Sequence, residues 1–69
     1  MPEDPLAMAE RHVREGEARV ARQAALVEHM VAVNLDPTDA RAVLEELKTT
    51  LALACEHLRW ERQVRGLEP

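Results

Sequence analysis

Six side chains within the helical pattern are candidates for transition-metal ligands. They are the three histidines, the single cysteine and two methionines: His12, His29, His57, Cys55, Met8 and Met30. A di-metal carboxylate site in a helical bundle needs inward-facing Glu-x-x-His pairs, and the sequence has none. Cys55 and His57 are two residues apart, so on a helix they point to different faces. We expect packing or surface roles, no metal site and no cofactor, with His57 the candidate for a site shared across a dimer axis.

Cys55 is the residue best suited to nucleophilic catalysis, which also needs a base and an oxyanion hole. In the middle of a helix it has no free backbone N–H groups beside it. We therefore interpret Cys55 as a small buried hydrophobic residue near the helix contact. The chain has no glycine-rich phosphate loop, and a small elongated bundle offers little concave volume. We expect no enzyme activity, no catalytic residue and no small-molecule substrate.

Arginines cluster in two segments that could contact phosphates. They are Arg11, Arg14, Arg19 and Arg22 in the first half, and Arg59, Arg62 and Arg65 near the C-terminus. In an antiparallel hairpin both segments lie at the end away from the turn. The net charge is -4, however, and glutamates are interspersed among the arginines. A solvated mixed-charge surface is the favoured interpretation, and nucleic-acid binding is the alternative.

Helices must position these side chains, because the composition does not suit a sheet. Ala, Leu, Glu and Arg are frequent, Phe and Tyr are absent, and Trp60 is the only aromatic residue. The 69 residues allow one domain, residues 1–69. A chain this short buries only about 60% of its unfolded surface. With one cysteine it has no internal disulfide, so ideal helix packing, a metal or oligomerisation has to stabilise the fold.

Two Asp-Pro pairs mark the starts of two helices. Asp36 suits an N-cap, and Pro37 suits the first helical position because it lacks an N–H group. Asp4 and Pro5 repeat this arrangement. Each pair therefore predicts a helix that follows it directly.

The helix ends predict a hairpin. Asn34 suits a C-cap and Gly66 a stop signal, which gives helices at about 5–33 and 37–65. Two helices of matched length and a short connection must run antiparallel. The predicted fold class is therefore all-α, an antiparallel two-helix hairpin.

A heptad repeat of apolar residues follows both helices and predicts the hairpin core. Its members are Val13, Val20, Val27 and Met30 in the first helix, and Leu44, Leu47, Leu51 and Leu58 in the second. If the chain reverses at residues 34–36, Val20 faces Leu51. Gly16 then lies near Ala54 and Cys55, where small residues let the backbones approach.

The second helix carries another apolar stripe, which consists of Leu53, His57, Trp60, Val64 and Leu67. Its spacing of four and three is helical, and it points away from the core stripe. A two-helix hairpin covers one face of each helix, so this surface needs a partner. The economical partner is a second copy, giving a homodimeric four-helix bundle. An unidentified protein partner and a monomer with Trp60 folded over its own end stay open.

The sequence also bears on location. No apolar stretch approaches the roughly 20 residues that span a bilayer. The N-terminal segment Met-Pro-Glu-Asp-Pro lacks the basic start and apolar run of a signal peptide. A lone thiol suits a reducing compartment. We expect a soluble cytoplasmic protein without membrane contact.

The sequence also contains a longer pattern. It comprises Ala9 to Val13, Glu15 to Glu17, Arg19 to Gln23, and the leucine-rich segment from Leu44 to Leu53. This resembles a group of short bacterial proteins with the pattern A-E-R-H-x-x-E-G-E-x-R-x-x-R-Q and a later L-x-x-L-x-x-T-L-x-L helix. The resemblance implies a short bacterial protein and brings no known activity. Our leading hypothesis is a non-enzymatic, self-associating interaction or regulatory module. The alternative is a nucleic-acid-binding dimer whose architecture is similar to that of the RNA-binding Rop protein.

Overall fold

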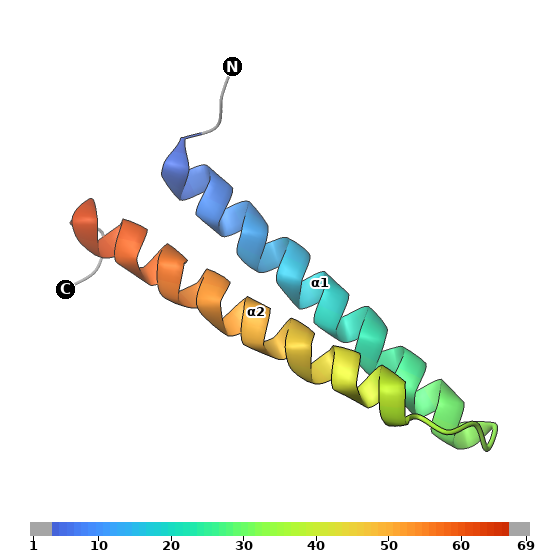
Figure 1. Cartoon of the computed structure of the whole chain (residues 1–69). Coiled ribbons are helices and arrows are strands. Elements are labelled where there is room, and N and C mark those ends of the chain that lie inside the picture. The colour runs from blue at the N-terminus through green and yellow to red at the C-terminus, as the bar shows by residue number, and fades with distance from the viewer. Residues whose placement is uncertain (1–3, 67–69) are drawn as a thin grey trace.

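The computed structural model describes residues 4–66, which form two helices and the connection between them. Helix α1 comprises Pro5–Ala32, and α2 comprises Thr38–Val64. The two helices run antiparallel and side by side, and the start of α1 and the end of α2 both lie away from the turn (Figure 1). This confirms the predicted all-α hairpin, with each helix boundary within one residue of expectation. In the described part of the chain, neither helix is long and apolar enough to span a membrane.

Helix α1 ends in a Schellman motif built on an asparagine. Asn34 adopts a left-handed conformation with φ of 61°. The N–H of Leu35 donates to the carbonyl of Met30 at 2.8 Å, and the N–H of Asn34 donates to the carbonyl of Val31 at 3.2 Å. These bonds satisfy carbonyls that the end of a helix leaves open. Asparagine fits because it adopts this backbone region more readily than branched residues do.

Helix α2 begins at Thr38, one residue later than expected. Asp36 precedes the helix and accepts hydrogen bonds from its first residue. The Asp36 Oδ1 atom accepts hydrogen bonds from the Thr38 hydroxyl at 2.6 Å and from the Thr38 N–H at 3.0 Å. The first helical bond runs from the Arg41 N–H to the Pro37 carbonyl at 2.8 Å, so Pro37 is the cap. The hydroxyl bond first, and then the backbone bond, lower the pKa of Asp36 from its usual value.

The core between the helices is thin. Among residues 4–66, the buried ones are Ala9, Val27, Ala40 and Glu61, and no large side chain is fully buried. The other residues of the heptad stripe are half-buried between the helices: Val13, Val20, Met30, Leu44, Leu47, Leu51 and Leu58. The stripe therefore faces the neighbouring helix, but two helices alone do not enclose it.

The pairing of the helices differs from the expectation by about one turn. Leu51 lies against Gly16 rather than against Val20: its Cδ1 atom would be 3.0 Å from a Cβ atom at Gly16. The reason is the connection. Residues 35–37 are not helical, and non-helical residues advance up to about twice as far per residue as helical ones. The prediction assumed that the two helices reverse symmetrically about residues 34–36. It therefore misplaced α2 along the hairpin axis relative to α1.

The left-handed conformation of Asn34 gives a first prediction. Asn34→Val should lower the free energy of unfolding by about 1–2 kcal/mol, because a branched side chain is strained at positive φ. Asn34→Gly, the matched control, should be at least as stable as the wild type. Urea unfolding followed by circular dichroism measures both. Equal stability of the valine and glycine variants would contradict the motif.

The hydrogen bonds of Asp36 give a second prediction. Because its pKa is lowered in the folded state, the charged carboxylate stabilises the fold above its unfolded pKa of about 3.9. This contribution is lost as the pH falls through the lower, folded pKa. Asp36→Ala should therefore reduce the unfolding temperature at pH 7 and lose that effect as the pH falls through the lowered pKa of Asp36. A constant difference between variant and wild type across this range would show that the charge is not involved.

Candidate interaction surface

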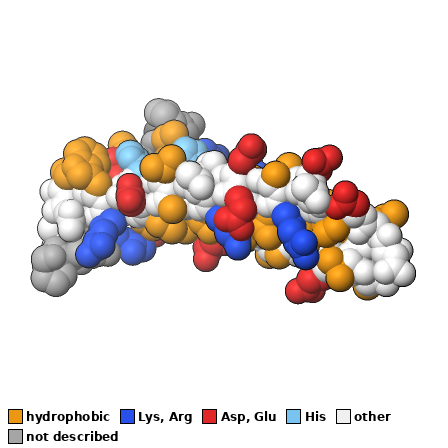
Figure 2. All heavy atoms as spheres, turned by 60° about the horizontal axis from the view of Figure 1, so that its bottom comes forward, with side chains coloured by type: hydrophobic (Ala, Val, Ile, Leu, Met, Phe, Trp, Pro, Cys, Tyr) orange, Lys and Arg blue, Asp and Glu red, His pale blue; other side chains and the backbone are white. Residues whose placement is uncertain are grey.

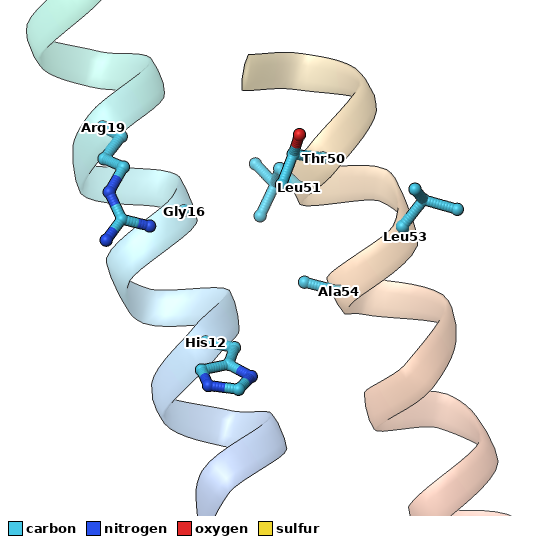
Figure 3. Close-up of a pocket in the computed structure, with 7 residues that line it drawn as sticks. All are labelled: His12, Gly16, Arg19, Thr50, Leu51, Leu53 and Ala54. Carbon is cyan, nitrogen blue, oxygen red and sulfur yellow. The ribbon is translucent and has the colours of Figure 1, made fainter. Parts of the chain in front are cut away.

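One side of the hairpin carries a hollow between the helices, of about 320 Å³. It is lined by His12, Gly16 and Arg19 of α1 and by Thr50, Leu51, Leu53 and Ala54 of α2 (Figure 3). Leu51 and Ala54 point towards α1, whereas Leu53 points away from it (Figure 3). The hollow exists because Gly16 and Ala54 have little or no side chain to fill it. Apolar atoms dominate its lining, and the polar side chains in it include the guanidinium of Arg19 and the imidazole of His12.

The hollow belongs to a surface that we call the second face, formed by one stripe from each helix. The α2 stripe is Val43, Glu46, Thr50, Leu53, His57, Trp60 and Val64. The α1 stripe is Met8, His12, Glu15, Arg19, Arg22 and Leu26. Members of each stripe are three or four residues apart and therefore share a side of their helix. Both stripes contribute to the lining of the hollow, so both lie on the same side of the hairpin.

The apolar side chains of the second face are widely exposed. The exposed fraction is 61% for Leu53, 56% for Trp60 and 63% for Val64. His57 is also exposed and stacks on Trp60 with ring centroids 6.2 Å apart. Hydrophobic side chains lie beside histidines at the end of the molecule opposite the turn (Figure 2). Leu67, the last residue of the predicted α2 stripe, lies outside the described residues.

The accessible surface of the chain is large for its mass. It amounts to 5235 Å², against about 4,400 Å² for a compact monomer of this size. The excess, on the order of 800 Å², is close to what one partner buries in a standard protein interface.

Charged side chains tie the two helices together at the open end. The guanidinium of Arg65, just after α2, donates a hydrogen bond to the carboxylate of Asp4, just before α1. Glu61 lies 3.7 Å from the Arg65 Nε atom and 3.8 Å from the His57 Nε2 atom. Its side chain is only 11% exposed. The i,i+4 spacing of Glu61 and Arg65 is visible in the sequence, but the bond to Asp4 depends on the pairing of the helices.

The arginines are spread along the hairpin, and Arg11, Arg19 and Arg65 lie beside carboxylates. Arg11 and Arg19 each lie 3.5 Å from a carboxylate oxygen of Glu15. Arg19 lines the hollow beside Leu51, in the middle of the hairpin, so its predicted place at the open end is wrong. Arg22 lies still closer to the turn. The arginines of the open half are Arg11, Arg14, Arg59, Arg62 and Arg65.

The candidate metal and nucleophile residues are separated. Cys55 is exposed, which corrects its interpretation as a buried residue. It follows Ala54 on the side of α2 away from the hollow, one position past the helix contact. Among residues 4–66, no group of three or more His, Cys, Asp and Glu side chains is close enough to hold a metal ion. The described residues therefore bring together apolar side chains and pairs of opposite charge.

The close approach at Gly16 gives a third prediction. Gly16→Leu should lower the free energy of unfolding by about 1–3 kcal/mol, because the new side chain collides with Leu51. Ala18→Leu, at an exposed position of the same helix, should change it by less than about 0.5 kcal/mol. Urea unfolding again provides the measurement. If both variants were equally stable, the helices would not depend on a small residue here.

No relative supplies a function for these features. Comparisons with models of protein families, with characterised proteins and with solved structures found no match. The resemblance to short bacterial proteins therefore stays a prediction. The function of the chain has to be argued from the second face itself.

Proposed function

We propose that this protein is a non-enzymatic helical hairpin that self-associates and acts as a small interaction or regulatory module. In the dimer, the second faces of two copies pack together as a four-helix bundle. The observation that carries this proposal is the exposure of Leu53, Trp60 and Val64 along one side of α2. The thin core of the single hairpin supports it, because a second copy encloses side chains that two helices leave half-buried.

The magnitudes favour assembly. Full burial of a large apolar side chain contributes about 1.5–3 kcal/mol relative to exposure. Three such residues are exposed on α2, and a symmetric dimer buries them twice. Because these side chains are already partly covered, the gain is comparable with an association cost of about 4–15 kcal/mol. The net stability of small domains is itself only about 5 kcal/mol, so dimerisation and folding would be strongly coupled.

A second copy fits the second face better than a small substrate does. The hollow presents His12 and Arg19 on a largely apolar lining, and the exposed Cys55 thiol does not line it. The excess surface is similar in size to the area that one partner buries in a standard interface. The exposed thiol also suits a reducing compartment, so we place the protein in the cytoplasm.

The alternative of nucleic-acid binding gains no specific support. Arg11, Arg19 and Arg65 lie beside carboxylates that compete with phosphates. Titration of labelled RNA and DNA at two salt concentrations tests the alternative. Binding that is tight at low salt and weakens steeply as salt rises would establish phosphate contacts. Absence of binding at low salt removes this function.

Replacement of Trp60 tests the proposal. Trp60→Glu should raise the dissociation constant of the dimer at least tenfold, about 1.4 kcal/mol, because it places a charge in the apolar interface. Ala52→Glu is the matched control, because Ala52 is exposed on α2 outside the second face and should leave association unchanged. Sedimentation equilibrium and light scattering measure both. A wild type that stays monomeric at high micromolar concentration would refute the proposal, and equal effects would place the interface elsewhere.

A further inference from the structure

A polar side chain occupies one position in the otherwise largely apolar contact between the helices. Gln23 follows Val20 by three residues on the contact stripe of α1, and it is half-buried. Its Nε2 atom donates a hydrogen bond to the backbone carbonyl of Ala40, in the first turn of α2, at 2.9 Å. Ala40 is one of the buried residues of the described chain, with an exposed fraction of 8%. The bond therefore crosses the hairpin inside the helix contact, close to the turn.

This hydrogen bond depends on the small side chain of Ala40. A carbonyl within a helix has a second lone pair, so it can accept the amide of Gln23 as well as its helical hydrogen bond. The long Gln23 side chain reaches the carbonyl because the methyl group of Ala40 leaves room between the helices. A partly buried amide without a partner would cost free energy, and here the amide has one. Gln23 is therefore matched to one place on α2.

The contact of Leu51 with Gly16 follows the same rule, with the long side chain on the other helix. Leu51 points towards α1 beside Gly16, where there is no side chain to meet it (Figure 3). The two contacts agree on one alignment of the helices. Seven residues after Gly16 is Gln23, and seven before Leu51 is Leu44. Leu44 lies one helical turn after Ala40, in the direction in which the Ala40 carbonyl points.

A competing alignment of the helices exists, displaced from the observed one by about one turn. It is the pairing that the heptad pattern predicts, in which Leu51 faces Val20 instead of Gly16. In that alignment Leu44 takes the place of Ala40 beside Gln23. Two large side chains would then meet at both contacts, and the leucine side chain would cover the carbonyl that the amide needs. The apolar heptad positions repeat in both alignments, so they discriminate little between them.

We infer that Gln23 is a positioning residue that keeps α1 and α2 in a single alignment. The connection brings Ala40 beside Gln23, and the hydrogen bond between them disfavours the displaced alignment. Polar residues at core positions of coiled coils act in this way, because only one alignment satisfies them, and they lower stability in return. The inference goes beyond the proposed function but bears on the same surface. The two stripes of the second face keep their places relative to each other only while this alignment holds.

Two cysteine pairs distinguish the alignments, in a chain whose own thiol is removed by Cys55→Ser. Val13→Cys with Ala54→Cys reports the observed alignment, because each position lies one turn from the close contact at the glycine, towards the open end. Val13→Cys with Leu58→Cys reports the displaced alignment. A glutathione redox buffer at low protein concentration measures how readily each pair closes within one chain. The ratio of the two closure constants reports the populations of the two alignments.

Replacement of Gln23 by leucine tests the inference. Gln23→Leu should raise closure of the displaced pair relative to the observed pair at least about fivefold, because no unmet amide then disfavours the displaced alignment. Its urea unfolding midpoint should not fall, because an apolar residue replaces a polar one in the contact. Gln63→Leu, the same change at an exposed position of α2, is the matched control and should leave the ratio unchanged.

The ratio separates positioning from a general effect on the fold. A looser hairpin would close both pairs less readily and leave their ratio as it was. An unchanged ratio in Gln23→Leu would therefore overturn the inference and show that the connection alone keeps the helices aligned. Because closure is measured within single chains, a protein that stays monomeric would contradict the proposed function and leave this result intact.

Discussion

Two helices packed side by side can each bury only one stripe of side chains, and this constraint governs the whole structure. The heptad stripe is used within the hairpin, and even there the buried residues of the described chain are small or at the edge of the contact: Ala9, Val27, Ala40 and Glu61. Gly16 lets Leu51 approach closely in the middle. A second apolar stripe on α2, with Leu53, Trp60 and Val64, stays largely exposed. In the proposed dimer, a second copy covers this exposed stripe.

The connection between the helices determines their register, that is, which residues of α1 and α2 lie side by side. The left-handed Asn34 reverses the chain, and Asp36 organises the first turn of α2. The non-helical residues between them determine how far α2 has advanced when it begins. These few residues therefore determine which residue of α2 lies beside each residue of α1, on the second face as well as in the core.

Much of the fold could be predicted from local signals. The Asp-Pro starts, Asn34 and Gly66 gave the helix boundaries because capping depends on a few adjacent residues. The pairing of Gly16 with Leu51 could not be predicted, because it depends on the path of a non-helical segment. Arg19 lies near the middle of α1 in any register, so placing it at the open end was a separate error. The exposure of Cys55 was misjudged because one residue decides whether a side chain faces the partner helix or solvent.

The second stripe on α2 was visible in the sequence, but its extent was not. The structure adds the α1 stripe from Met8 to Leu26 and the hollow that joins the two. The predicted row of apolar residues on α2 is therefore one half of a surface that both helices form, and this surface carries apolar and charged side chains. Residues of α1 on this face are polar in the middle, so hydrophobicity alone did not reveal them.

The central claim is that the hairpin is half of an assembly. The most direct measurement is the unfolding temperature of the wild type over protein concentrations from about 1 to 100 µM, because only an oligomer couples its stability to concentration. A dimer predicts a temperature that rises steadily with concentration. An unfolding temperature that is independent of concentration, for a cooperatively folded chain, would contradict the account.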